Sequence, residues 1–146
     1  MVGRFTRRTW IGVGSLAVFS ALFAAVPAAQ AATLTNPQRA EWGCELSNKS
    51  VVQGITAALI GRGWALTQND SKGNLVAQIL VRGKHTLVID IAYDKKSYDV
   101  TYKSSINLNY KDNGDGTAVI HGNANKWLAN IHGDIARQLA AICSAE

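Results

Sequence analysis

The apolar residues of this chain follow two periods, and these divide it into helical and extended segments. Between Ser47 and Arg62, apolar residues recur every three or four positions, which is typical of an amphipathic helix. From Trp64 onward, apolar and polar residues alternate, as they do along strands that bury one face. A last run with helical spacing follows a candidate cap at Asn123 and consists of Leu128, Ile131, Ile135, Leu139 and Ile142. The pattern therefore predicts a helix, several strands and a second helix.

Turn-forming residues divide the alternating region into about four strands. These turns fall at residues 69–73, 82–84 and 94–97, each of which contains glycine, asparagine, aspartate or serine. Connections this short favour an antiparallel meander with one polar face. We therefore expect an α+β fold of two layers, in which the N-terminal and the C-terminal helix both pack on the apolar face of the sheet.

The end of the fourth strand is set by residue preferences. Apolar alternation continues through residues 106–110, but the serines and asparagines of this part have weak strand preference. We expect the strand to end near Ser104 and residues 106–110 to cross an edge of the sheet as an ordered loop. One long strand is the alternative.

The N-terminal residues have the features of an export signal. Residues 1–31 combine three arginines, an apolar run over 11–26 and the triplet Ala29-Gln30-Ala31, which together predict a cleaved signal peptide. An uncleaved anchor is the alternative, although the run of 16 residues is short for a membrane span. The Sec route is favoured, and Arg7-Arg8 also allows the twin-arginine route, which carries folded cargo.

The expected export signal defines the rest of the domain organisation. Residues 32–43 contain Pro37 and lack periodicity, so they predict a flexible lead-in. Residues 44–146 are long enough for a single α+β domain. We expect a periplasmic or secreted protein with no integral membrane segment in the mature chain.

Removal of the signal peptide changes the charge balance. The whole chain has 15 basic and 10 acidic residues, and the signal contains three of the arginines and none of the acids. The mature chain therefore has 12 basic and 10 acidic residues, a net charge near +2. A near-neutral exported domain does not fit a nucleic-acid partner, which would require a strongly basic surface.

The chain contains two cysteines, Cys44 and Cys143, near the two ends of the expected domain. In an oxidising compartment they predict a disulfide bond. Closing a loop of about 100 residues contributes at most about 4 to 5 kcal/mol in the chain-entropy model. Two free thiols or a redox pair are the alternatives, but no Cys-x-x-Cys motif supports redox chemistry. The bridge also requires the two helices to run side by side.

Metal and cofactor motifs are not recognisable in this sequence. The three histidines, His85, His121 and His132, lack the close spacing of a helical metal pair, so a site would need His85 to meet another histidine by folding, with a carboxylate nearby. Residues 112–116 contain Asn-Gly and Asp-Gly, but the ligand pattern of a calcium loop is missing, so we expect a turn. No nucleophile elbow and no phosphate-binding glycine loop occurs. We therefore predict no metal and no cofactor.

A group of polar residues forms the candidate binding site. His121 precedes the last helix, whose first amides favour an anion, and residues of the preceding strand and loop are expected to converge with it. The candidate residues are Ser105, Asn107, Tyr110, His121 and Asn125. The alternative is that these groups only satisfy the backbone of an irregular loop.

Several short motifs give this chain a resemblance to a known family. The motifs Ser105-Ile106-Asn107-Leu108-Asn109-Tyr110, Ile120-His121 and Asn125-Lys126-Trp127 resemble a family of small, uncharacterised bacterial envelope proteins and lipoproteins. The sequence departs from that pattern at Ala124, where an aromatic residue is expected, and in the turn over 112–116, which looks extended. The resemblance implies an envelope location and an α+β domain, and it implies no activity.

Together these observations favour an envelope protein that is not an enzyme. It would bind a partner protein or a small ligand at a polar groove edge formed by the candidate residues. Two alternatives stay open at this point: a small periplasmic hydrolase that uses His121 as a base, and a metal carrier.

Overall fold

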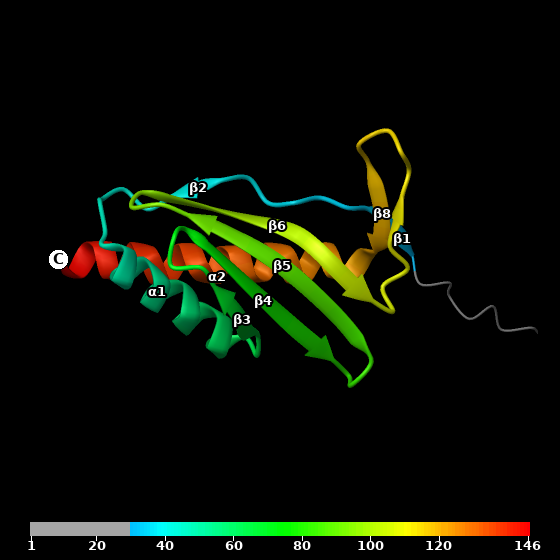
Figure 1. Cartoon of the computed structure of the whole chain (residues 1–146), viewed down its shortest axis with the longest axis horizontal. Helices are drawn as coiled ribbons and strands as arrows, with labels where there is room; N and C mark the ends of the chain where they lie inside the picture. Colours follow the sequence, from blue (N-terminus) through cyan, green and yellow to red (C-terminus); the bar gives the residue numbers. More distant parts are fainter. Residues whose placement is uncertain (1–29) are drawn as a thin grey trace, which may run out of the picture.

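The structure is a computed structural model that describes residues 30–146 (Figure 1). The predicted signal peptide over 1–31 therefore lies outside the described residues, except for Gln30 and Ala31. The elements, in chain order, are β1 (Ala31–Thr33), β2 (Ala40–Glu41), α1 (Asn48–Gly61), β3 (Ala65–Asn69), β4 (Asn74–Val81), β5 (His85–Tyr93), β6 (Ser97–Ile106), β7 (Lys111–Asp112), β8 (Ala118–His121) and α2 (Gly122–Ala145). This arrangement confirms the α+β class.

The strands of the expected meander form one antiparallel sheet of five strands in the order β2-β6-β5-β4-β3. The turn between β4 and β5 contains Arg82 and Gly83, and both residues have positive φ, 54° and 67°. Two adjacent residues with positive φ are typical of the turns that match the twist of a hairpin. Register irregularities interrupt the pairing of β6 with β5 and of β3 with β4.

A second, smaller sheet has the order β1-β8-β7 and projects at one end of the molecule (Figure 1). It contains part of the segment 32–43, which the sequence predicts to be a flexible lead-in. In the structure this segment contributes to β1 and β2, because β1 pairs with β8 and β2 pairs with β6. The sequence signal was missing because strands of two and three residues are too short to show alternation. A cleavage after Ala31 would remove only the first residue of β1.

The two helices pack beside each other, with α2 running behind the larger sheet (Figure 1). Their apolar stripes share one core with the inward residues of β4 and β5, and Leu59, Leu87, Ile89, Leu128 and Ile135 are fully buried in it. A Cβ atom on Gly54 of α1 would lie 2.7 Å from Leu139 of α2, so glycine allows the close approach of the two helices. Among residues 30–146, no helix is long and apolar enough to span a membrane.

The helix ends differ in how well the sequence predicts them. Ser47 caps α1, because its hydroxyl accepts a hydrogen bond from the Ser50 amide at 3.0 Å, and serine is a residue type that this position favours. The cap of α2 is His121 rather than Asn123, since His121 Nδ1 accepts from the Asn123 amide at 3.2 Å. The prediction of Asn123 as the cap is therefore wrong, because imidazole is an uncommon cap that propensity rules do not favour.

The disulfide bond between Cys44 and Cys143 is confirmed. It joins Cys44, which precedes α1, to Cys143 in the last turns of α2, and the two Cα atoms are 5.9 Å apart. The bond therefore holds together the ends of the two packed helices, as the topology required.

Residues 107–110 form the expected loop after β6. The strand continues through Ile106, two residues beyond Ser104, and pairing then stops. Asn107 and Asn109 have positive φ, 57° and 52°, a conformation that asparagine tolerates better than most side chains. The asparagines thus mark the place where the chain leaves the sheet.

Candidate functional site

The structure distributes the five predicted site residues over three places. Ser105 and Tyr110 lie at a pair of tyrosines, Asn125 lies against the N-terminal strand, and Asn107 and His121 flank a cleft. The expected convergence of all five at one groove edge is therefore not present among the described residues.

Ser105 and Tyr110 both contact Tyr102. The Ser105 hydroxyl lies 3.0 Å from the Tyr102 hydroxyl, and the rings of Tyr102 and Tyr110 are stacked with centroids 4.6 Å apart. Burial raises the pKa of the Tyr102 hydroxyl, although the hydrogen bond with Ser105 lowers it. The pair thus forms a neutral, packed cluster at the end of β6.

Asn125 holds the first strand in place. Its side-chain Nδ2 donates to the Thr33 carbonyl at 2.8 Å, and its Oδ1 accepts from the Thr35 amide at 3.0 Å. Both the oxygen and the nitrogen of the side-chain amide are therefore hydrogen-bonded to the backbone, at the end of β1 and just beyond it. This arrangement supports the structural alternative for Asn125.

Asn107 links the loop after β6 to the β4–β5 turn. Its Nδ2 donates to the Lys84 carbonyl at 2.7 Å, and its own carbonyl accepts from His85 Nδ1 at 2.8 Å. These two contacts fix the position of the hairpin turn and the orientation of the His85 ring. Asn107 therefore supports the neighbouring cleft without lining it.

A cleft of about 240 Å³ lies between the β4–β5 turn, the loop after β6 and the start of α2. Its lining residues are Val81, Arg82, His85, Leu108, His121, Asn123 and Trp127. Figure 1 shows that the turn and the start of α2 lie at the same end of the molecule. The lining combines three apolar or aromatic residues with four polar or charged ones, so it is more polar than that of most small-ligand sites.

The hydrogen bonds of the two histidines fix which ring nitrogen carries the proton in the neutral form. His85 Nδ1 faces a carbonyl oxygen, so it must donate, and His85 Nε2 then has a free lone pair. His121 Nδ1 accepts from an amide, so His121 Nε2 carries the hydrogen. The ring centroids are 6.4 Å apart. The cleft thus offers one acceptor and one donor from two neighbouring imidazoles.

This geometry does not favour the catalytic alternative. A base at His121 would need a free lone pair, but its Nδ1 caps α2 and its Nε2 carries the hydrogen. The described residues that line the cleft include no serine, threonine, cysteine or carboxylate to act as nucleophile or acid.

The geometry meets only part of the condition for a metal site, which was a second histidine beside His85 and a carboxylate nearby. Folding does bring His85 beside His121, which is the condition set by the sequence. Within residues 30–146, however, no group of three or more histidine, cysteine or acidic side chains is placed to hold an ion. His121 Nε2 would also have to lose its hydrogen, since its other nitrogen is engaged.

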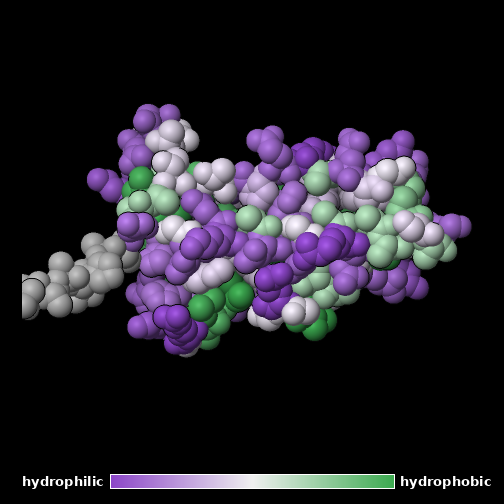
Figure 2. All heavy atoms as spheres, turned by 180° about the vertical axis from the view of Figure 1, so that it is seen from behind, coloured by the Kyte–Doolittle hydropathy of each residue, from purple (hydrophilic) through white to green (hydrophobic). Residues whose placement is uncertain are grey.

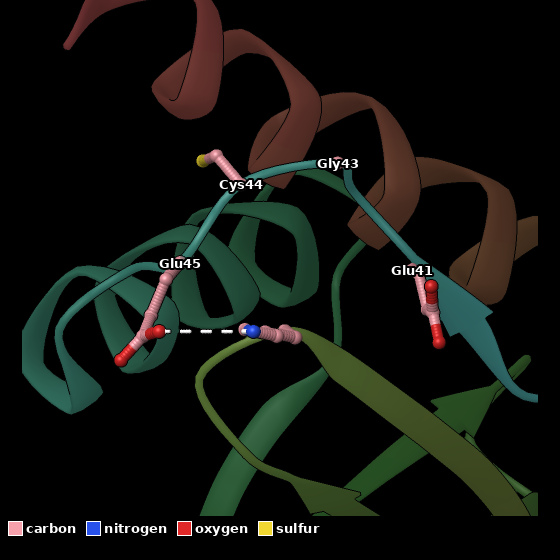
Figure 3. A pocket seen from close by; sticks show the side chains of 5 residues that line it. Glu41, Gly43, Cys44 and Glu45 are labelled. Carbon is pink, nitrogen blue, oxygen red and sulfur yellow. Dashed lines mark ion pairs between the residues drawn. The ribbon is translucent and has the colours of Figure 1, made fainter.

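A second pocket of about 320 Å³ lies beside the disulfide and is lined by Glu41, Gly43, Cys44, Glu45 and Lys96 (Figure 3). Glu45 is paired with Lys95 and Lys96 at 3.5 and 3.8 Å. Figure 3 shows the Cys44 side chain pointing away from this ion pair. Exposed pairs of this kind contribute little, and the remaining charged residue of the lining, Glu41, makes no ion pair within residues 30–146.

The opposite face of the molecule gives no stronger candidate. Figure 2 shows hydrophilic and hydrophobic residues mixed over this face, with the most hydrophobic ones in small separate groups. Large apolar patches mark many docking surfaces, so the view does not indicate one here.

Sequence reasoning found His121 as a binding residue and named His85 only as a possible metal ligand. It missed the other five residues that line the cleft, namely Val81, Arg82, Leu108, Asn123 and Trp127. One signal was present in the sequence. Residues 82–83 form a tight turn whose first position favours asparagine, aspartate or glycine, and arginine occupies it.

Comparisons with known proteins do not assign this chain to a family. A scan against protein-family models finds no match to the chain, and a search of curated proteins finds no similar sequence. The resemblance to small envelope proteins is therefore a proposal that is based on the quoted motifs.

Proposed function

We propose that this protein is exported to the bacterial envelope and binds a small ligand without transforming it, in the cleft between the β4–β5 turn and the start of α2. The observation that carries the proposal is the convergence of three separate chain segments on one cleft. Each segment contributes a different kind of group: Arg82 and His85 from the turn, Leu108 from the loop, and His121 and Trp127 from the helix region.

The rigidity of the cleft walls supports a binding role. Asn107 ties the turn to the loop, the His121 amide donates to the Leu108 carbonyl at 2.8 Å, and His121 caps α2. A site whose walls are fixed before binding loses less conformational entropy when the ligand arrives. The absence of a nucleophile or carboxylate among the described lining residues supports binding without catalysis.

Export is supported by the signal-like residues 1–31, the resemblance to envelope proteins, and the disulfide between Cys44 and Cys143. Disulfides persist in oxidising compartments and are rare in the cytosol. We expect the protein recovered from the envelope fraction of its host to begin at Ala32 and to contain no free thiol. Intact-mass measurement checks both points, and an uncleaved chain or two free thiols would contradict the export proposal.

The binding proposal is tested on the mature protein by NMR. Isotope-labelled protein is titrated with a panel of small acids, amines, sugars and amides, and the amide signals of Arg82, His85 and Asn123 are followed. We expect at least one chemical class to shift these signals and to be recovered unchanged. If no compound in the panel shifts them, the cleft is not a ligand site. Recovery of a chemically altered compound would instead favour the hydrolase.

A metal carrier is the second candidate, because His85 and His121 lie side by side. Titration with zinc and with copper, followed by native mass spectrometry, distinguishes it. A stoichiometric complex that is lost in His85→Gln would favour the metal carrier over the small-ligand proposal.

A further inference from the structure

Arg82 differs from the other arginines of the described chain in its ion pairs. Arg39 is paired with Asp94, and both Arg62 and Arg137 are paired with Asp134. Within residues 30–146, Arg82 makes no ion pair with a carboxylate, and this exposed residue is one of those that line the cleft. Its guanidinium is therefore available to a partner from outside the chain.

The backbone at Arg82 is also unfavourable for arginine. Its φ of 54° lies in the left-handed region, where the Cβ atom of a non-glycine residue crowds the following carbonyl oxygen. Asparagine before glycine is the preferred pair in such a turn. Arginine thus departs from the turn's residue preference at the one residue of the turn over 82–84 that lines the cleft, and such exceptions concentrate at functional sites.

The neighbouring groups set the charge that the cleft accepts. The described lining residues include one guanidinium and two imidazoles but no carboxylate. The first two amides of α2 are already engaged, because the Gly122 amide donates to the Gln30 carbonyl and the Asn123 amide donates to His121 Nδ1. Recognition of an anion therefore depends on side chains rather than on the helix terminus.

We infer that the ligand of the cleft is a small oxyanion, a carboxylate or a phosphate, that Arg82 binds through its guanidinium. This inference deepens the proposed function and depends on it. A guanidinium donates two parallel hydrogen bonds to either kind of oxyanion. His121 Nε2–H supplies a further donor, and the free lone pair of His85 Nε2 accepts from a hydroxyl or ammonium group next to the anion. A small 2-hydroxy acid or amino acid has this combination of groups.

The test compares two variants that remove the same charge from the same turn. Arg82→Asn removes the guanidinium and introduces the residue that the turn prefers. Lys84→Asn removes a lysine whose side chain does not line the cleft. The mature protein and both variants are titrated at physiological ionic strength with lactate, inorganic phosphate and lactamide. Lactamide matches lactate in shape but is uncharged.

We expect lactate, phosphate or both to shift the amide signals of Arg82, His85 and Asn123, and lactamide to shift none of them. Loss of a charged hydrogen bond should weaken binding by at least about tenfold in Arg82→Asn. Lys84→Asn should change it by less than about twofold, because exposed charges are screened at this ionic strength. The melting temperature of Arg82→Asn should equal or exceed that of the unmodified protein, which excludes misfolding as the cause.

Three results would overturn the inference. If lactamide binds as tightly as lactate and Arg82→Asn has the affinity of the unmodified protein, the cleft binds a ligand, but the ligand is not selected as an oxyanion. Equal weakening in the two variants would indicate a diffuse charge effect rather than a guanidinium site. Binding of none of the three probes, together with a negative panel, would remove the proposed function as well.

Discussion

The role of His121 as the cap of α2 makes the sharpest prediction on stability. His121 Nδ1 accepts a hydrogen bond from the Asn123 amide, one of the first amides of α2, which have no partner within the helix. Replacement by alanine removes the acceptor, and replacement by serine supplies a hydroxyl that is favoured at this position. Alanine and serine are similar in size, so the two variants lose similar contacts from the imidazole. The difference between their free energies of unfolding therefore isolates the cap.

The expected difference is about 1 kcal/mol in favour of His121→Ser, the typical contribution of a cap. For a domain of this size, that corresponds to a difference in melting temperature of about 4 °C. Both variants are measured as oxidised proteins by thermal and urea denaturation at neutral pH. Ligand binding, measured on the same samples, should weaken in both, because neither carries the Nε2–H donor.

Equal stability of the two variants would refute the capping argument. A ligand affinity that is restored in His121→Ser would show that only the helix start matters to binding, and that the imidazole donor does not. The pair thus separates the structural role of His121 from its proposed contact with the ligand.

Two further predictions concern the rest of the fold. Gly54→Ala should destabilise the protein by about 1 to 3 kcal/mol, because the new methyl group overpacks the contact with α2. The control Gly61→Ala should not destabilise it, because a Cβ atom there meets nothing within 4 Å. Equal effects of the two substitutions in thermal denaturation would contradict the close approach of the helices. The hydrogen bond from Arg62 holds the pKa of Asp134 below its usual value, so this carboxylate contributes stability above about pH 4 that is lost as the pH falls through its lowered pKa. The deficit of Asp134→Asn in urea denaturation should therefore be present at pH 7 and shrink toward pH 2, and an unchanged deficit would argue against the pair.

The candidate site was predictable only in part. His121 was identified because it precedes a helix, and this position does place it at the cleft. Asn125 and Ser105 were grouped with it by sequence proximity, but each points to another partner: the Thr33 carbonyl and the Tyr102 hydroxyl. Polar residues of a short irregular segment face different directions, and a sequence without a strict period does not show which.

The sequence by itself determined the longer helices and strands and the cross-link. The spacing of apolar residues decides which face of a helix or strand is buried, and this local property was sufficient to place α1, β4, β5 and α2. The two cysteines determined the bridge because the described chain offers no other pairing.

The tertiary structure alone decided which polar groups meet. His85 and His121 lie far apart in the chain, and they become neighbours because the β4–β5 turn reaches the start of α2. The same packing leaves Arg82 without a carboxylate partner among residues 30–146 and gives a regular pairing to the short strand β1. Such contacts depend on the distance and direction of whole elements, which the hydrophobic period of any single segment does not encode.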